Sequence, residues 1–344
     1  MPGTTNVNLL FTTLPGTDLS VSRVCLGTWQ FNGGQADITW SGQEEKLSKA
    51  IVDKALETGV NFFDTAEAYK NSEVVLGKAL EGRRQNAVIA SKFGQNHPEG
   101  KVEYSAMDIE NALTQSLTKL NTTYIDLYQV HWPICVANME ETVQQLKLEQ
   151  SRGRILHYGY CNFGVENMKA FQLAGGKPVT TQMPYNLLWR AIEHSTLPLI
   201  RENNLSVLAY SALQQGLLTG KFHNAQEVPE GRRRTRLFNS QSTTLAKHGQ
   251  PGMETETFQA IGEIRKISEE LGESMSTVAL SWLLAQKNVE SVIVGCSSVQ
   301  QVGENCRVVP LKPAIIERLN SATDQVKNLL GDNADLWAAE SRMK

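Results

Sequence analysis

The chain has 344 residues, of which 41% are hydrophobic and 20% are charged, and these proportions are ordinary for a globular protein. A formal net charge of −3 gives no overall field that would attract nucleic acid or an anionic membrane. No stretch has the roughly 18 consecutive apolar residues of a membrane span, and five cysteines without a CxxC pair are typical of a reducing compartment. We therefore expect a cytoplasmic protein with neither a nucleic-acid nor a membrane partner.

The chain begins with two strand-like stretches, at residues 8–14 and 19–24, on either side of Pro15-Gly16. A Pro-Gly pair between such stretches predicts a hairpin turn. We expect this N-terminal β-hairpin, within residues 1–23, to close the floor of the fold that follows and to have a structural role.

From residue 24 to about residue 305, strand and helix signals alternate, which predicts βα units around a parallel sheet. The first helix is predicted to begin at a capping box of Ser41 and Glu44 and to bury Leu47. An open doubly wound sheet shows the same alternation, but its GxGxxG signature is absent. Eight units predict a (β/α)8 TIM barrel, and we expect one domain over residues 1–344. The predicted strands are residues 24–29, 61–66, 87–93, 125–131, 155–161, 179–185, 206–213 and 291–295.

Two segments outside the repeating units are notable for their length. Residues 214–256, after the seventh strand, form a polar connection far longer than the usual two to six residues or so, which predicts a lid or binding loop. The C-terminal tail, residues 326–344, is expected to pack either on its own barrel or on a neighbouring molecule. No pattern in the sequence selects an oligomeric state.

Four residues with acid-base side chains, Asp64, Tyr69, Lys92 and His131, lie at or just past the ends of three consecutive predicted strands. In a parallel barrel these ends meet at one mouth. Each residue alone is more typical of a structural role, but together they predict a catalytic site for proton delivery to a carbonyl oxygen. The ammonium is expected to lower the pKa of the phenol from its usual value of about 10. The histidines show no HxH or HExxH spacing, so no metal site is expected.

The motifs around these residues resemble those of the aldo-keto reductase family, over nearly the whole length from residue 14 to about residue 308. The similarity is greatest to the branch that contains potassium-channel β subunits and many bacterial and plant reductases. It rests on GVNFFDTAEAYKNSEVVLGKAL (59–80), followed in order by ASKFG, DLYQVHWP, GYCNF, TQMPYNLL, AYSAL and SSVQQVGEN.

The resemblance implies a role for each of the four residues. Tyr69 would be the general acid, Lys92 and Asp64 its charge-paired partners, and His131 the residue that orients the substrate carbonyl. The implied reaction is the NADPH-dependent reduction of an aldehyde or ketone to an alcohol, because no side chain can deliver a hydride and a nicotinamide must supply it. Trp29 and Trp132 are candidates for contact with this small-molecule substrate.

The resemblance also implies the contacts of the bound NADP. Asn162 and Gln182 would hold the carboxamide, and Tyr210 would stack on the nicotinamide ring. The turn after the seventh strand would lie at the pyrophosphate, and the start of the last barrel helix at the adenosine. The full implied set is Gly27, Thr28, Trp29, Asp64, Asn162, Gln182, Tyr210, Ser211, Leu213, Gly216, Arg233, Ser297, Gln301, Glu304 and Asn305.

The preference for NADP over NAD is expected from two features, the start of the last barrel helix and the RRRTR cluster at residues 232–236. The resemblance implies Arg233 as the partner of the 2′-phosphate, because it follows a Pro-Glu-Gly turn where related members carry such an arginine, and a guanidinium binds phosphate in a bidentate manner. A merely solvated run of charges is the alternative. The chain departs from the family at Cys161, where a serine is frequent, and at Gly295 and Gln301, where many members have a cation near the 2′-phosphate.

A second hypothesis comes from a different functional class. The protein would be a cofactor-binding regulatory subunit, similar to the channel β subunits, whose slow chemistry serves as a redox sensor. Very low turnover on every carbonyl would distinguish it from a reductase. A metal-dependent barrel hydrolase is a third possibility, but the sequence offers no ligand set for it.

Overall fold

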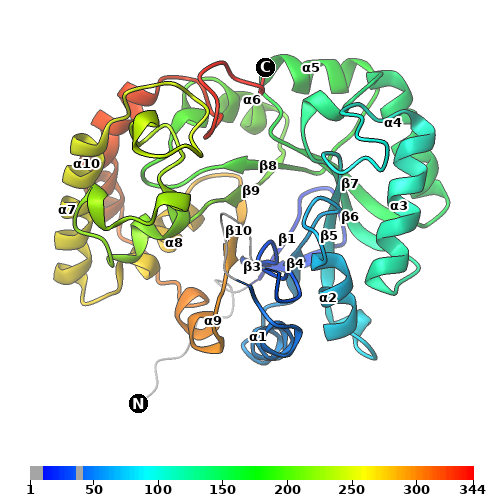
Figure 1. Ribbon diagram of the computed structural model, residues 1–344, viewed down its shortest axis with the longest axis horizontal. Helices are drawn as coiled ribbons and strands as arrows, with labels where there is room; N and C mark the ends of the chain where they lie inside the picture. Colours follow the sequence, from blue (N-terminus) through cyan, green and yellow to red (C-terminus); the bar gives the residue numbers. More distant parts are fainter. Residues whose placement is uncertain (1–10, 36–41) are drawn as a thin grey trace.

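The computed structural model describes residues 11–35 and 42–344, and its centre is a closed barrel of eight parallel strands (Figure 1). Each strand pairs with the next along the chain, and the last pairs with the first to close the ring. All eight predicted strands and the TIM barrel are thus confirmed. The strands are β3 (Val24–Gly27), β4 (Phe62–Asp64), β5 (Val88–Phe93), β6 (Ile125–Val130), β7 (Ile155–Cys161), β8 (Thr180–Pro184), β9 (Ser206–Tyr210) and β10 (Val289–Gly295).

Helices surround the barrel on its outside (Figure 1). Their apolar residues recur at helical spacing, so that α3, for example, buries Ile109, Ala112 and Leu113 on one face. The α-helices are α1 (Glu45–Glu57), α2 (Ser72–Ala79), α3 (Ala106–Leu120), α4 (Met139–Ser151), α5 (Val165–Leu173), α6 (Thr196–Glu202), α7 (Glu254–Leu271), α8 (Met275–Leu284), α9 (Val299–Asn305) and α10 (Pro313–Leu330). Short 3-10 turns, η2 (Arg84–Asn86), η3 (Pro133–Cys135) and η4 (Ala191–Glu193), complete the loops up to β9. None of the helices in the described ranges is long and apolar enough to cross a membrane.

The start of α1 differs from the prediction. The helix begins at Glu45 with Glu44 as its N-cap, and no side chain caps it; Ser41, the other half of the predicted capping box, lies outside the described residues. Leu47 is exposed, because the buried face of α1 consists of Ser48, Ile51, Val52 and Ala55 and Leu47 lies at the edge of that face.

The N-terminal hairpin closes the floor of the barrel, as predicted. Strands β1 (Phe11–Thr13) and β2 (Ser20–Ser22) pair antiparallel, and the backbone N–H of Ser22 donates to Oδ1 of Asn61, just before β4. Leu14 and Val21 are fully buried against side chains from the barrel interior. The floor is therefore apolar and sealed, and the opposite end of the barrel is left for chemistry.

The long connection between β9 and α7 consists of short 3-10 turns held by buried side chains. The turns are η5 (Gln214–Thr219), η6 (Ala225–Glu227), η7 (Glu230–Arg232) and η8 (Ser240–Ser242), and Leu237 and Phe238 anchor the segment in the core. It borders the pocket described below.

The C-terminal tail packs on its own barrel, which decides between the two arrangements left open by the sequence. Trp189 Nε1 donates to the carbonyl of Ala334 at 3.0 Å, and the backbone N–H of Lys344 donates to Oδ1 of Asn167 on α5 at 2.8 Å. Figure 1 accordingly shows the C-terminus beside α5. Both ends of the tail are fixed to the barrel.

Candidate active site

Parallel strand ends bring the four acid-base residues together. Asp64 is the last residue of β4, Lys92 is on β5 one residue from its end, and His131 directly follows β6. Tyr69 lies in the loop that leads from β4 to α2. Because all the barrel strands run in the same direction, these positions share the C-terminal mouth, as the sequence predicts.

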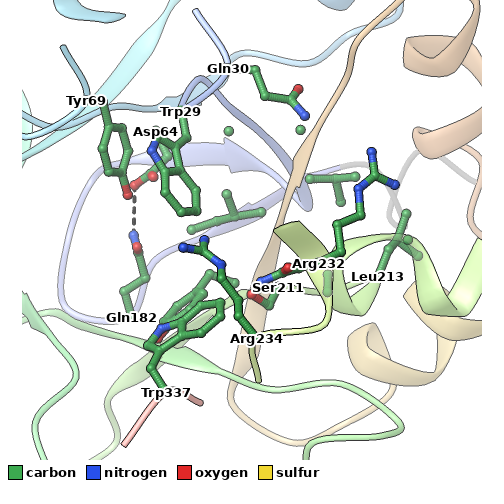
Figure 2. A pocket seen from close by; sticks show the side chains of 18 of the residues that line it. Trp29, Gln30, Asp64, Tyr69, Gln182, Ser211, Leu213, Arg232, Arg234 and Trp337 are labelled. Atoms are coloured by element: carbon green, nitrogen blue, oxygen red, sulfur yellow. Dashed lines mark hydrogen bonds between the residues drawn. The ribbon is translucent and has the colours of Figure 1, made fainter. Parts of the chain in front are cut away.

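A buried ion pair forms the base of the site. Nζ of Lys92 lies 2.7 Å from Oδ1 of Asp64, and it also donates to the carbonyl of Thr65 at 2.8 Å and to the hydroxyl of Tyr69 at 3.4 Å. Gln182 on β8 donates to the other Asp64 oxygen at 2.8 Å (Figure 2). An ammonium has three donors, so every proton of Lys92 has an acceptor and its position is fixed.

Burial outweighs the ammonium in setting the acidity of Tyr69. Burial raises the pKa of Tyr69 to about 12; the charge of Lys92 opposes this rise and the charge of Asp64 adds to it. The expectation of a lowered phenol pKa is therefore wrong for this site, because burial, with a smaller contribution from the charge of Asp64, outweighs the charge of Lys92. Tyr69 is a neutral phenol at physiological pH, the form that can give up a proton.

His131 is neutral as well. Burial, followed by the charge of Lys92, lowers the pKa of His131 to about 3. Its ring stands edge-on to that of Tyr69, with centroids 5.7 Å apart, and its Nδ1 has no hydrogen-bond partner within the described ranges. A neutral imidazole beside a neutral phenol offers two uncharged hydrogen-bond donors to one acceptor.

Asp64, Tyr69 and His131 line a large pocket of about 1440 Å³, and Lys92 is fully buried behind them. Small-molecule pockets are usually about 300–1,000 Å³, so this one has room for a dinucleotide together with a small substrate. Trp132 and all the predicted cofactor residues except Arg233 line it: Gly27, Thr28, Trp29, Asp64, Asn162, Gln182, Tyr210, Ser211, Leu213, Gly216, Ser297, Gln301, Glu304 and Asn305. Across the described part of the chain, no group of three or more His, Cys, Asp or Glu side chains is arranged to hold a metal ion.

The turn after β9 has the form of a phosphate cradle. Ser211, Gln215 and Gly216 all have left-handed backbone angles, with φ of 53°, 53° and 95°, and turns of this kind direct backbone N–H groups toward anions. A Cβ on Gly216 would lie 3.0 Å from Nζ of Lys221 and 3.3 Å from Nη1 of Arg232. Glycine thus keeps open a space that two cations border, as a bound phosphate requires.

Hydrogen bonds hold the residues predicted for the nicotinamide end. The Tyr210 hydroxyl donates to Oδ1 of Asn162 at 2.8 Å, and Nδ2 of Asn162 donates to the carbonyl of His131 at 3.0 Å. Asn162 has a φ of 63°, a left-handed angle that asparagine tolerates better than most residues. Cys161, which replaces the frequent serine, is buried.

At the predicted adenosine end, Ser298 is the N-cap of α9, and its hydroxyl accepts from the backbone N–H of Gln301 at 3.2 Å. The side chain of Gln301 accepts from the backbone N–H and the hydroxyl of Ser297. Nearby, Oε1 of Gln30 is buried without a hydrogen-bond partner within the described ranges, and Figure 2 shows its side chain in the pocket. The orphaned oxygen is suited to a donor on a bound molecule.

The structure places Arg233, the phosphate partner predicted from the sequence, outside the lining of the pocket. Its neighbours Arg232 and Arg234 line the pocket, whereas Arg233 does not. The guanidinium of Arg234 lies 4.6 Å from the Trp337 ring and 5.9 Å from the Trp29 ring (Figure 2). Distant contacts fix this segment, such as the hydrogen bond that the backbone N–H of Arg236 donates to the carbonyl of Leu336, and these contacts carry no sequence motif.

Several residues that line the pocket have no individual role in the sequence-based prediction. They come from the long connection, the start of α8 and the C-terminal tail: Lys221, Arg232, Arg234, Ser274, Ser276, Trp337 and Arg342. The basic character of the 232–236 cluster was a usable signal for two of them. The tail has no comparable pattern.

The buried pair gives a stability prediction. Asp64→Asn leaves the Lys92 ammonium buried without its counter-charge, so we expect the free energy of unfolding to fall by about 3–5 kcal/mol, measured by urea denaturation. The double variant Asp64→Asn/Lys92→Met removes both charges and is expected to recover most of that loss. Equal losses of unfolding free energy in the single and double variants would show that the unpaired ammonium of Lys92 is not the cause of the destabilisation.

Comparison with known proteins agrees with this geometry. Residues 23–324 match the Aldo/keto reductase family. The chain is 31% identical over 310 residues to the NADH-specific methylglyoxal reductase of Escherichia coli (strain K12), covering 84% of this chain and 90% of that one. It is 28% identical over 320 residues to a probable voltage-gated potassium channel subunit beta of Oryza sativa subsp. japonica, covering 88% and 93%. The glycerol dehydrogenase from Gluconobacter oxydans has a TM-score of 0.77 at 29% identity, covering 92% of this chain and 95% of that one. The chain belongs to the aldo/keto reductase family of oxidoreductases.

Proposed function

We propose that the protein reduces an aldehyde or ketone to an alcohol with NADPH, and that Tyr69 donates the proton. The observation that carries this proposal is the pairing of a neutral phenol with a neutral imidazole at the floor of the pocket. Lys92 stands behind the phenol, 3.4 Å from its oxygen. This arrangement is suited to an acceptor whose negative charge grows during the reaction.

When bound, the nicotinamide supplies the hydride that the carbonyl carbon receives. The carbonyl oxygen then gains negative charge, which the Tyr69 hydroxyl and a neutral His131 N–H stabilise as it develops. Tyr69 transfers its proton to that oxygen and completes the alcohol. The Lys92 ammonium stabilises the phenolate left behind. Burial lowers the pKa of Lys92, but the charge and hydrogen bond of Asp64, together with the charge of Tyr69, outweigh it and raise the pKa, so that the ammonium stays charged.

The proposal of NADPH rather than NADH rests on residues of this chain, since the Escherichia coli relative is named as NADH-specific. Lys221 and Arg232 border the space beside Gly216, and both line the pocket. Burial lowers the pKa of each of these cations, and a bound anion would favour the charged form of both. We assign a cofactor phosphate to this pair, with Arg232 in the role first given to Arg233.

The proposed setting follows from the same features. The five cysteines are free thiols, four of them buried, which fits a cytoplasmic location. The proposed partner is a small carbonyl compound. A regulatory, redox-sensing subunit is a second candidate, favoured by the 28% identity to the rice relative, and the experiment below distinguishes the two.

Tyr69→Phe tests the proton donor. The variant is expected to lower kcat by about 10²–10⁴-fold, because general acid catalysis is worth that much, while the Kd for NADPH stays within about threefold because the hydroxyl acts mainly in the transition state. Tyr124→Phe is the matched control, since it removes a hydroxyl just before β6, at the opposite end of the barrel. Turnover is followed by NADPH absorbance with a panel of aldehydes and ketones.

Near-normal kcat in the Tyr69→Phe variant would remove Tyr69 from the mechanism. Tight NADPH binding by the wild type without turnover on any carbonyl of the panel would favour the regulatory subunit.

Arg232→Gln tests the cofactor assignment. We expect the Kd for NADPH to rise by about 10–100-fold, since hydrogen bonds to charged groups are worth about 1.5–3 kcal/mol, and the Kd for NADH to change much less. Arg233→Gln, one residue away and outside the pocket, is the control and should leave both affinities within about twofold. Intrinsic fluorescence titration measures all four constants. Equal losses of affinity for NADPH and NADH in Arg232→Gln would show that Arg232 binds the pyrophosphate, which both cofactors have. A loss of NADPH affinity in Arg233→Gln alone would show that Arg233 binds the 2′-phosphate, as predicted from the sequence.

A further inference from the structure

The C-terminal tail carries an arginine into the pocket near the proposed reacting centre. Arg342 lines the pocket, and its guanidinium carbon lies 4.1 Å from the ring centroid of Trp132, the residue that follows His131. Burial and the charge of Asp335 raise the pKa of Tyr210, and the charge of Arg342 opposes them. The guanidinium is thus within electrostatic range of the tyrosine assigned to the nicotinamide ring.

One edge of this guanidinium is already used. Nε donates to Oδ2 of Asp335 at 2.7 Å and Nη2 donates to Oδ1 at 2.9 Å. Asp335 is fully buried, and its Oδ1 also accepts from the backbone N–H of Trp337 at 3.0 Å. The carboxylate therefore fixes the plane of the guanidinium. The hydrogen bonds of Ala334 and Lys344 to the barrel hold the tail on either side of this pair.

The opposite edge remains open. A guanidinium has five N–H donors in a rigid fork, and Asp335 takes one on Nε and one on Nη2. Both donors on Nη1 and one on Nη2 are left, and in the described part of the chain no acceptor takes a hydrogen bond from Nη1. The exposed Glu340, which also lines the pocket, forms no ion pair with Arg342 among the described residues. Two parallel N–H groups at this edge match the two oxygens of a carboxylate.

Cofactor phosphates have their own cations in this pocket, so Arg342 is not needed for them. Lys221 and Arg232 lie beside Gly216 in the turn after β9, whereas Arg342 lies over Trp132, after β6. Asp335 cancels part of the charge of Arg342, which suits a monoanion better than a phosphate dianion. The aromatic surface of Trp132 provides an apolar wall next to the charge.

We infer that Arg342, oriented by Asp335 and packed on Trp132, binds a carboxylate of the substrate, so that the preferred substrates are carbonyl compounds that carry a carboxylate. This inference rests on the proposed reductase function and names its substrate class. Arg342 contacts the substrate directly, whereas Asp335 is a positioning residue.

The test compares charged aldehydes with neutral ones of the same shape. The pairs are 4-oxobutanoate with 4-methylpentanal, and 6-oxohexanoate with 6-methylheptanal, which differ only in carboxylate against isopropyl. For the wild type we expect kcat/KM to favour the anion of at least one pair by about tenfold or more. Arg342→Gln should lower kcat/KM for that anion by about 10–100-fold and leave its neutral partner within about twofold, and Arg342→Lys should restore part of the preference as a point charge.

Two further variants separate recognition from folding. Asp335→Asn/Arg342→Gln removes the charge without leaving a buried carboxylate unpaired, and it should show the same selective loss as Arg342→Gln. Arg318→Gln removes an arginine that is also paired with a carboxylate, Glu270, but lies outside the pocket, and it should change neither class of substrate. A wild type without preference, or equal losses for charged and neutral aldehydes in both Arg342 variants, would overturn the inference.

A binding measurement separates failure of this inference from failure of the proposed function. Butanoate is titrated by calorimetry into the NADPH complex of the wild type and of Arg342→Gln, with butan-1-ol as the neutral control. If no carbonyl is turned over but butanoate binds in an Arg342-dependent way, the reductase proposal fails and the carboxylate site stands. If butanoate binds equally to both proteins, or to neither, the carboxylate site is overturned whatever the turnover shows.

Discussion

The ion pair between Lys92 and Asp64 is the interaction on which the rest of the site depends. Removing two charges from water is costly, and the pair is stable only because Thr65, Tyr69 and Gln182 use its remaining hydrogen-bonding capacity. The pair comes from β4 and β5, and its partners come from the loop after β4 and from β8. The closed barrel is what holds strand ends from such distant parts of the sequence at hydrogen-bond distance, so fold and acid-base chemistry depend on each other.

The barrel and the four acid-base residues were predictable because the signals for them are local. Strand and helix periodicity give the order of the elements, and the parallel topology places Asp64, Lys92 and His131 at one mouth. Other features depend on tertiary contacts. The acidity of Tyr69 follows from burial, which spacing does not reveal. Arg232 lines the pocket and Arg233 does not, and this difference depends on how the long connection packs on the rest of the chain.

The mouth of the pocket combines segments that have no sequence relation to one another. Trp29 follows β3, Arg234 belongs to the long connection after β9, and Trp337 belongs to the C-terminal tail, yet their side chains meet in the described structure. The acid-base residues lie at the ends of the strands, whereas the residues proposed to select the cofactor and substrate lie on these attached segments. This division is common in barrel enzymes. Arg342 could not be predicted for the same reason. No sequence motif marks it, and it reaches the pocket only because the C-terminal tail packs on the barrel.

The central claim is that a neutral Tyr69 gives up the proton. The most direct measurement is kcat/KM for carbonyl reduction from about pH 5 to about pH 10. Tyr69 has a raised pKa of about 12 and is protonated below it, and His131 has a lowered pKa of about 3 and is neutral above it. We therefore expect kcat/KM to stay constant across this pH range. A fall in kcat/KM with a midpoint between about pH 6 and about pH 9 would contradict a neutral Tyr69 as the proton donor. The same fall should then persist in variants that replace a tyrosine or histidine far from the pocket.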